Sequence, residues 1–269
     1  MVLMAIGMVL VWTSLRDKVI EMFNRRFMIN KKDDAEEAPE NGYLTFSSTD
    51  SFTLNVYDNA KHWDGTLEYS TNKKNWNVWN GTSISSGNNN ELYLRGTGNS
   101  VITGRDSGEY KWILTPSSSN KIRCIGNIEN LLDYRTVLNG EHPVMGDICY
   151  AYMFFDCRSL VQSPELPATE LASICYSFMF KGCEALTQIP ELPATNLTSD
   201  CYSGMFDGCT SLKFSTTKTA ECPNEYRIPY SGTGTTASNA LFYMFFRTSG
   251  TFTGDPSINT TYYTNATVV

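Results

Sequence analysis

Residues 149–160 read CYAYMFFDCRSL, and the chain repeats this stretch as CYSFMFKGCEAL at 175–186 and as CYSGMFDGCTSL at 201–212. Successive copies are 26 residues apart. Between them lies a second shared segment, PELPATEL at 164–171 and PELPATNL at 190–197. Self-similarity at a fixed period indicates a repeat architecture, in which each unit buries its apolar face against its neighbours.

Within one copy, apolar residues recur at offsets zero, four, five and eight, and a leucine follows at offset eleven. Such offsets lie on one face of an α-helix, so the spacing predicts a short helix in each copy. Gly182 and Gly208 allow a tight exit from that helix, and the prolines between copies form a rigid corner. The predicted buried core of the repeats is Cys149, Met153, Phe154, Cys157, Leu160, Cys175, Met179, Phe180, Cys183, Leu186, Cys201, Met205, Phe206, Cys209 and Leu212. A decayed fourth copy, ALFYMF at 240–245, fits the atypical end of such an array.

A tyrosine follows the first cysteine of each full copy, at Tyr150, Tyr176 and Tyr202. The predicted helix places these residues off the apolar stripe, so we expect them to be exposed and take them as candidate ligand contacts. The alternative is a stacked aromatic ladder that only stabilises the array.

The run C-Y-x-x-M-F-x-G-C-x-S-L, followed by P-E-L-P-A-T, resembles the BspA-like leucine-rich repeats of bacterial surface proteins and of bacteriophage tail or appendage proteins. A period of 26 residues falls within the leucine-rich range. The resemblance implies a short leucine-rich-repeat-type solenoid over residues 125–269. It also implies an opening cap at 126–132, a degenerate closing unit at 226–236 and a β domain upstream of the repeats.

Residues 43–124 alternate between apolar and polar side chains in short runs separated by turn-forming residues. This pattern predicts an antiparallel β-sandwich-like domain, so the whole chain is α+β or mostly β. The alternation places Trp76, Val78 and Trp112 inward. Trp63 and Trp79 lie near turns and are candidate stacking residues for a sugar or another ligand, the alternative being that these rings are part of the core.

Residues 1–32 form an apolar and then basic arm that precedes an acidic linker at 33–42. A stripe at steps of four and three predicts an amphipathic N-terminal helix; it consists of Met8, Trp12, Leu15, Val19 and Met22. The apolar run of about twelve residues is shorter than the roughly 20 that a membrane-spanning helix needs. We expect residues 1–30 to bind another copy of the chain or other proteins of a particle. Packing on its own domain and contact with a membrane surface are the alternatives.

The net charge of −7 supplies no broad basic surface, so no nucleic-acid partner is expected. Eight cysteines form no C-x-x-C pair, and His62 and His142 fit no zinc spacing, so no metal site is expected. Packed helices would hold equivalent cysteines of neighbouring copies about 8–10 Å apart, too far for a disulfide. We therefore expect buried thiols in the repeats, and leave the state of Cys124 and Cys222 open.

No catalytic motif occurs in the chain, and neither a cofactor nor an enzymatic activity is expected. Glu165 and Glu191 resemble an acid–base pair, but both occupy the same repeat position, which favours a role at the corner of the repeat. We expect a non-enzymatic bacteriophage virion protein, a tail or head appendage that binds a host surface glycan or protein or takes part in assembly. A bacterial cell-surface adhesin and a purely structural decoration protein without a ligand are the alternatives.

Overall fold

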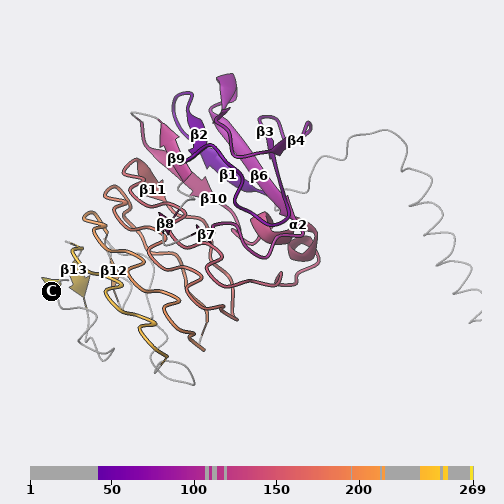
Figure 1. Cartoon of the computed structure of the whole chain (residues 1–269). Coiled ribbons are helices and arrows are strands. Elements are labelled where there is room, and N and C mark those ends of the chain that lie inside the picture. Colours follow the sequence, from indigo (N-terminus) through magenta and orange to yellow (C-terminus); the bar gives the residue numbers. More distant parts are fainter. Residues whose placement is uncertain are drawn as a thin grey trace, which may run out of the picture. The chain divides into compact units, whose positions relative to one another are not determined.

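The structure is a computed structural model, and it describes residues 42–106, 109–110, 114–117, 120–194, 196–212, 214–215, 237–248, 251–253 and 267–268. The chain divides into two compact units, residues 1–37 and 38–269, and every described residue belongs to the second. The predicted N-terminal helix and, apart from Gly42, the acidic linker therefore lie outside the described residues. The described part of the second unit is mostly β, with one short α-helix and a mixed sheet that does not close into a barrel (Figure 1).

The largest sheet has six strands in the order β11-β10-β1-β6-β3-β4. Its strands are β1 Leu44–Ser47, β3 Thr66–Ser70, β4 Asn77–Trp79, β6 Glu91–Thr97, β10 Ile122–Ile125 and β11 Leu160–Gln162. All neighbours are antiparallel except β10 and β11, which are parallel. Because β11 belongs to the first repeat copy, the sheet continues across the predicted boundary at residue 124, and both sides share one hydrophobic core.

Smaller elements complete the fold. A second antiparallel sheet has the order β5-β2-β9 and consists of β2 Thr53–Val56, β5 Ile84–Ser85 and β9 Leu114–Ser117. The other elements are β7 Arg105–Asp106 paired with β8 Glu109–Tyr110, the 3-10 turn η1 Gly87–Asn89, the helix α2 Asn130–Leu138, and the parallel strands β12 Phe214–Ser215, β13 Thr251–Thr253 and β14 Thr267–Val268. Helix α2 is kinked at Asp133, whose backbone is extended and whose carboxylate accepts from the N–H groups of Arg135 and Thr136.

The side chains of strand β4 point to the opposite faces of the sheet from those predicted. Trp79 pairs with Leu67 in the register, and both side chains are buried. Val78 pairs with Glu68 on the other face and is 70% exposed, so its predicted inward position was wrong. Trp76 is half-buried on that outer face, where its ring lies 4.0 Å from the guanidinium of Arg95. A shift of one residue moves every side chain of a strand to the opposite face, and here it turns Trp79 into the core.

The copies are built from hydrogen-bonded turns, so the predicted helices were wrong. In the first copy, Ile148, Tyr152 and Asp156 have φ values of 63°, 59° and 55°. Every fourth residue of the other copies is left-handed in the same way. A left-handed residue in each set of four prevents an α-helix and gives the chain a four-residue period. Offsets of zero, four and eight fall on one side at either period, which is why the sequence spacing fitted a helix.

Alternate backbone N–H groups bond from one copy to the next. Those of residues 148, 150, 152, 154 and 156 donate to the carbonyls of residues 173, 175, 177, 179 and 181. The same pattern joins the second copy to the third and the third to the fourth, always from the earlier copy to the later one. The intervening N–H groups bond three residues back, as Met153 does to Tyr150. Each turn is therefore satisfied partly by itself and partly by its neighbour.

The β domain covers the exposed side of the first copy. The N–H groups of Ile102 and Thr103 both donate to the carbonyl of Cys149, which no earlier copy can satisfy. Asp64 fixes this loop by accepting from both the N–H and the hydroxyl of Ser100, and from the N–H of Val101. On the other side, the backbone N–H of Ile128 donates to the carbonyl of Glu165, and the N–H of Glu165 donates to the carbonyl of Gly126. These bonds lie at the position of the predicted opening cap. The predicted closing unit at 226–236 lies outside the described residues.

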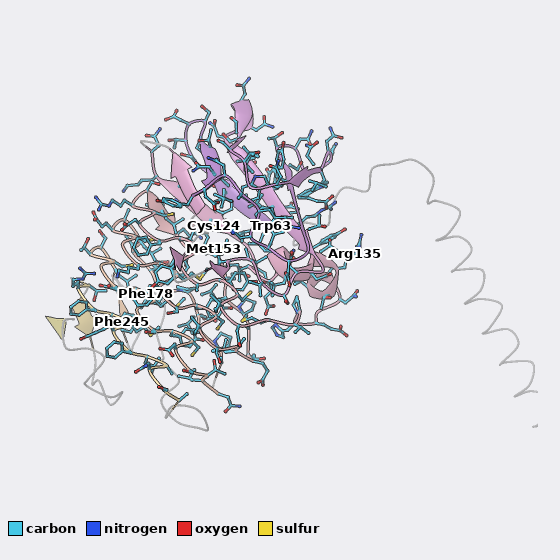
Figure 2. The ribbon with its side chains drawn as sticks, in the orientation of Figure 1. Trp63, Cys124, Arg135, Met153, Phe178 and Phe245 are labelled. Atoms are coloured by element: carbon cyan, nitrogen blue, oxygen red, sulfur yellow. The ribbon has the colours of Figure 1, made fainter. Side chains whose placement is uncertain are left out.

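All fifteen predicted core residues of the repeats are at most 2% exposed. Cys124 and Met153 lie inside the fold, where the β domain meets the first copy (Figure 2). The seven described cysteines are buried thiols, Cys124 included, and Cys222 lies outside the described residues. The separation expected for packed helices does not apply, because equivalent rings of neighbouring copies stack with centroids only 5.4–5.9 Å apart.

Gly204 and Gly208 both have left-handed backbone angles, but a side chain is tolerated less well at Gly204. Gly204 and Gly208 have φ values of 59° and 76°, which cost a side-chain-bearing residue about 1–2 kcal/mol. A Cβ at Gly204 would also lie 2.1 Å from the Phe178 ring, whereas a Cβ at Gly208 would meet nothing closer than 3.7 Å. We expect Gly208→Ala to lower the free energy of unfolding by about 1 kcal/mol and Gly204→Ala by about 3 kcal/mol, measured in urea. Equal losses would mean that the Phe178 ring moves aside without cost.

Candidate functional site

The tryptophans predicted to contact a ligand are in the core. Trp63 is 3% exposed and Trp79 is 1% exposed, and their rings pack 5.3 Å apart. The indole N–H of Trp79 donates to the carbonyl of Thr82 at 2.7 Å. Neither ring offers a face to a ligand, so the prediction that they bind one was wrong. Trp112 lies outside the described residues.

The tyrosines predicted to be exposed are buried as well. Tyr150, Tyr176 and Tyr202 are at most 1% exposed, and adjacent rings stack at 5.6 and 5.9 Å with interplanar angles of 5°. In a four-residue period, the residue after the first cysteine also points inward. The three tyrosines therefore form an internal ladder, which was the alternative considered above, and they are not surface contacts.

The hydroxyl groups of this ladder differ in their partners. The Tyr150 hydroxyl donates to the carbonyl of Ile128 at 3.3 Å, whereas the buried Tyr176 hydroxyl has no hydrogen-bond partner in the structure. We expect Tyr150→Phe to lower the free energy of unfolding by about 1 kcal/mol, and Tyr176→Phe to leave it unchanged or raise it by up to about 1 kcal/mol. Urea unfolding of the two variants side by side measures this difference. A loss of similar size in both would show that Tyr176 has a partner in solution, such as a buried water.

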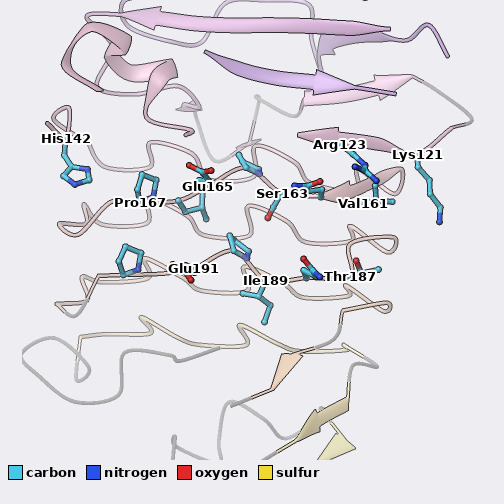
Figure 3. Close-up of a pocket in the computed structure, with 16 residues that line it drawn as sticks. Lys121, Arg123, His142, Val161, Ser163, Glu165, Pro167, Thr187, Ile189 and Glu191 are labelled. Carbon is cyan, nitrogen blue, oxygen red and sulfur yellow. The ribbon is translucent and has the colours of Figure 1, made fainter. Parts of the chain in front are cut away.

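An open groove lies on the face formed by the extended segments between copies (Figure 3). It has a volume of about 1020 Å³ and runs from β10 across the first two copies. The two Pro-Glu-Leu-Pro corners build its floor: Leu166 and Leu192 are buried beneath it, and Glu165 and Glu191 are exposed on it. The flanking prolines fix the backbone at both corners, so the two carboxylates occupy equivalent places in neighbouring copies.

Charges of opposite sign occupy different parts of the groove. Lys121 and Arg123 lie on or beside β10 and are exposed, as Glu165 and Glu191 are in the two copies. Among the described residues, none of these four side chains forms an ion pair. The four charges therefore remain available to a ligand.

His142 lies at the end of the groove opposite Lys121 (Figure 3). Its Nδ1 lies 2.8 and 3.0 Å from the two carboxylate oxygens of Glu129, whose side chain is only 2% exposed. These distances fit a hydrogen bond between the imidazole ring and the buried carboxyl group. Burial raises the pKa of the Glu129 carboxyl above its ordinary value, and the hydrogen bond from His142 offsets this only in part.

The sequence pattern did not identify this groove as a site. The recurrence of Glu165 and Glu191 indicated a corner, and the structure places both carboxylates on the groove floor at that corner. Lys121, Arg123 and His142 were missed because they come from outside the repeats. The alternation of buried Ile122 and Cys124 with exposed Arg123 is the signal that would have placed Arg123 on an open sheet face.

The described residues supply no metal centre, because no three His, Cys, Asp or Glu side chains among them gather as ligands would. The described thiols have pKa values raised by burial, which is opposite to the shift that activates a cysteine nucleophile. Within the described part of the chain, no helix has the length and apolar character needed to cross a bilayer. Comparison with protein-family models, with curated proteins and with solved structures found no match to this chain.

Proposed function

We propose that this chain is a non-enzymatic recognition protein of a bacteriophage virion, in which the groove across the first two copies binds the ligand. The observation that carries the proposal is a set of four exposed charges, without an ion-pair partner among the described residues, in an open groove of about 1020 Å³. Charges without partners gain most from a ligand that neutralises them. The placement in a virion rests on the resemblance of the repeats to BspA-like sequences.

In this proposal, the copies form a short leucine-rich-repeat-type solenoid, and residues 43–124 form a sandwich-like domain that also caps it. The regular N–H to carbonyl bonds between successive copies support the solenoid. The shared core of the six-stranded sheet and the β5-β2-β9 sheet supports the sandwich-like domain. Each copy contacts its neighbours through the same positions, so the array behaves as a one-dimensional stack.

Binding of the fluorescently labelled full chain to cells of candidate hosts tests the proposed function. We expect Glu165→Gln/Glu191→Gln to reduce binding, because it removes two of the four groove charges. The matched control is Arg158→Gln/Glu184→Gln, which neutralises an exposed ion pair that does not line the groove and should leave binding unchanged. Equal binding by both variants would exclude the groove, and no binding to any host would favour a purely structural decoration protein.

Residues 1–30 are proposed to assemble the chain with itself or with other virion proteins. Light scattering on the full chain and on a chain that starts at Ala38 tests this role, because residues 38–269 are a compact unit of their own. Loss of an oligomer on shortening would support the proposal. A monomer in both cases, with the arm partitioning to lipid vesicles, would favour a membrane-tethered cell-surface protein.

A further inference from the structure

The two kinds of charge in the groove are separated along the strand direction. Arg123 pairs with Gln162 in the β10–β11 register, and Asn127 is bridged to Glu165 in the same parallel arrangement. Asn127 follows Arg123 by four residues and Glu165 follows Gln162 by three, which corresponds to about 10–13 Å of extended chain. The positive and negative groups of a ligand would therefore have to be about as far apart as residues i and i+4 of an extended peptide.

The rest of the lining suits a polypeptide better than a neutral sugar. Sugar rings are commonly bound by stacking on aromatic side chains, and the described residues that line the groove include no Phe, Tyr or Trp. The exposed amide of Gln162 lies beside Arg123, and Gln188 occupies the equivalent position in the next copy. A side-chain amide both donates and accepts, so it can pair with a peptide backbone that does the same. Val161 and Ile189 add half-buried apolar surface.

Two carboxylates define the negative end of the groove. Glu165 and Glu191 lie on the His142 side of the groove, away from Lys121 (Figure 3). They favour a cationic group at that end. Lys121 and Arg123 favour an anionic group at the other.

We propose that the groove binds an extended segment of a partner protein that carries acidic side chains at one end and basic side chains about four residues further along. This proposal rests on the proposed function, because it names the ligand class of the same groove. The acidic end lies against Lys121 and Arg123, and the basic end lies against Glu165 and Glu191. The groove selects its ligand by the distance between the ligand's acidic and basic side chains, and not by the ligand's net charge.

The test uses the full chain and synthetic peptides, with binding followed by fluorescence anisotropy. Two probes place an Asp pair and a Lys pair on either side of three uncharged residues, one in each chain direction. A third probe has the same composition with Asp and Lys alternating. We expect one separated-charge probe to bind at least about tenfold more tightly than the alternating probe, and to lose that advantage in about 0.5 M NaCl.

Variants of the two ends identify the contacts. We expect the affinity for the separated-charge probe to fall about tenfold in Lys121→Gln/Arg123→Gln and in Glu165→Gln/Glu191→Gln. The control Arg158→Gln/Glu184→Gln should leave this affinity unchanged. Glu165→Lys/Glu191→Lys should bind a probe with Asp pairs at both ends instead. Equal binding of separated and alternating probes would overturn the proposal, as would capture of an uncharged oligosaccharide by the same groove. If the oligosaccharide binds, the groove is still the recognition site. If every groove variant binds host cells as well as the unmodified chain does, the proposed function itself is wrong.

Discussion

We expect the free energy of unfolding to fall by roughly 10 kcal/mol between pH 7 and pH 9.5, which is the full stability of a typical domain. Burial raises the pKa of all seven described thiols, in the case of Cys201 to about 11. In the unfolded chain these thiols ionise near pH 8.5. A raised folded-state pKa gives stability that is fully present below the unfolded value and is lost as the pH rises above it. Each thiol then contributes a loss of about 1.4 kcal/mol per pH unit.

Urea unfolding in the presence of a reductant, at steps of half a pH unit, measures this loss. Cys175→Ala serves as the control, because it should reduce the slope by the contribution of one thiol although it also lowers the stability at pH 7. Stability that stays constant up to pH 9.5 would show that the thiols are not buried in solution.

The second large effect is expected at the centre of the stack. Phe180 is fully buried, and its ring stacks on Phe154 at 5.4 Å and on Phe206 at 5.6 Å. We expect Phe180→Ala to lower the free energy of unfolding by about 3–5 kcal/mol, because it leaves a ring-sized cavity between two copies. Phe180→Leu, which fills part of that cavity, should cost about 1–2 kcal/mol.

Tyr243 provides the comparison for this change. It is an aromatic residue of the fourth copy with 51% of its surface exposed, so Tyr243→Ala should cost less than about 1 kcal/mol. Thermal and urea unfolding of the three variants give the ranking. A loss at Phe180 no larger than that at Tyr243 would mean that the copies do not pack on each other through this column.

The sequence predicted the positions of the buried repeat residues but not the backbone that buries them. Cys149, Met153 and Cys157 are four residues apart, which fits one face of a helix and fits a four-residue turn equally well. The left-handed residues that distinguish the two are mostly not glycine, and Ile148 and Ile174 even carry β-branched side chains at φ values near 62°. Local propensity argues against that conformation, so the bonds to the next copy must impose it.

The groove was less predictable than the core, since it depends on long-range pairing. Arg123 and Gln162 are neighbours only because β10 and β11 pair, and His142 is placed by its hydrogen bond to buried Glu129. The tyrosines and tryptophans were predicted to contact a ligand because they are aromatic and lie near turns or beside an apolar stripe in the sequence. Burial of Tyr176 and Trp79 follows from the turn period and from the register of β4, neither of which the sequence pattern specified.

The direction of the bonds between copies has an electrostatic consequence. In an ordinary β-sheet, neighbouring peptide groups point in opposite directions and their dipoles largely cancel. Here the N–H groups that join the described turns of successive copies all point from the earlier copy to the later one, so these peptide dipoles add. The stack therefore carries a permanent dipole along its axis, like that of an α-helix, with its positive pole at the fourth copy and its negative pole against the β domain. Each copy added to such an array lengthens this dipole without adding any charged residue.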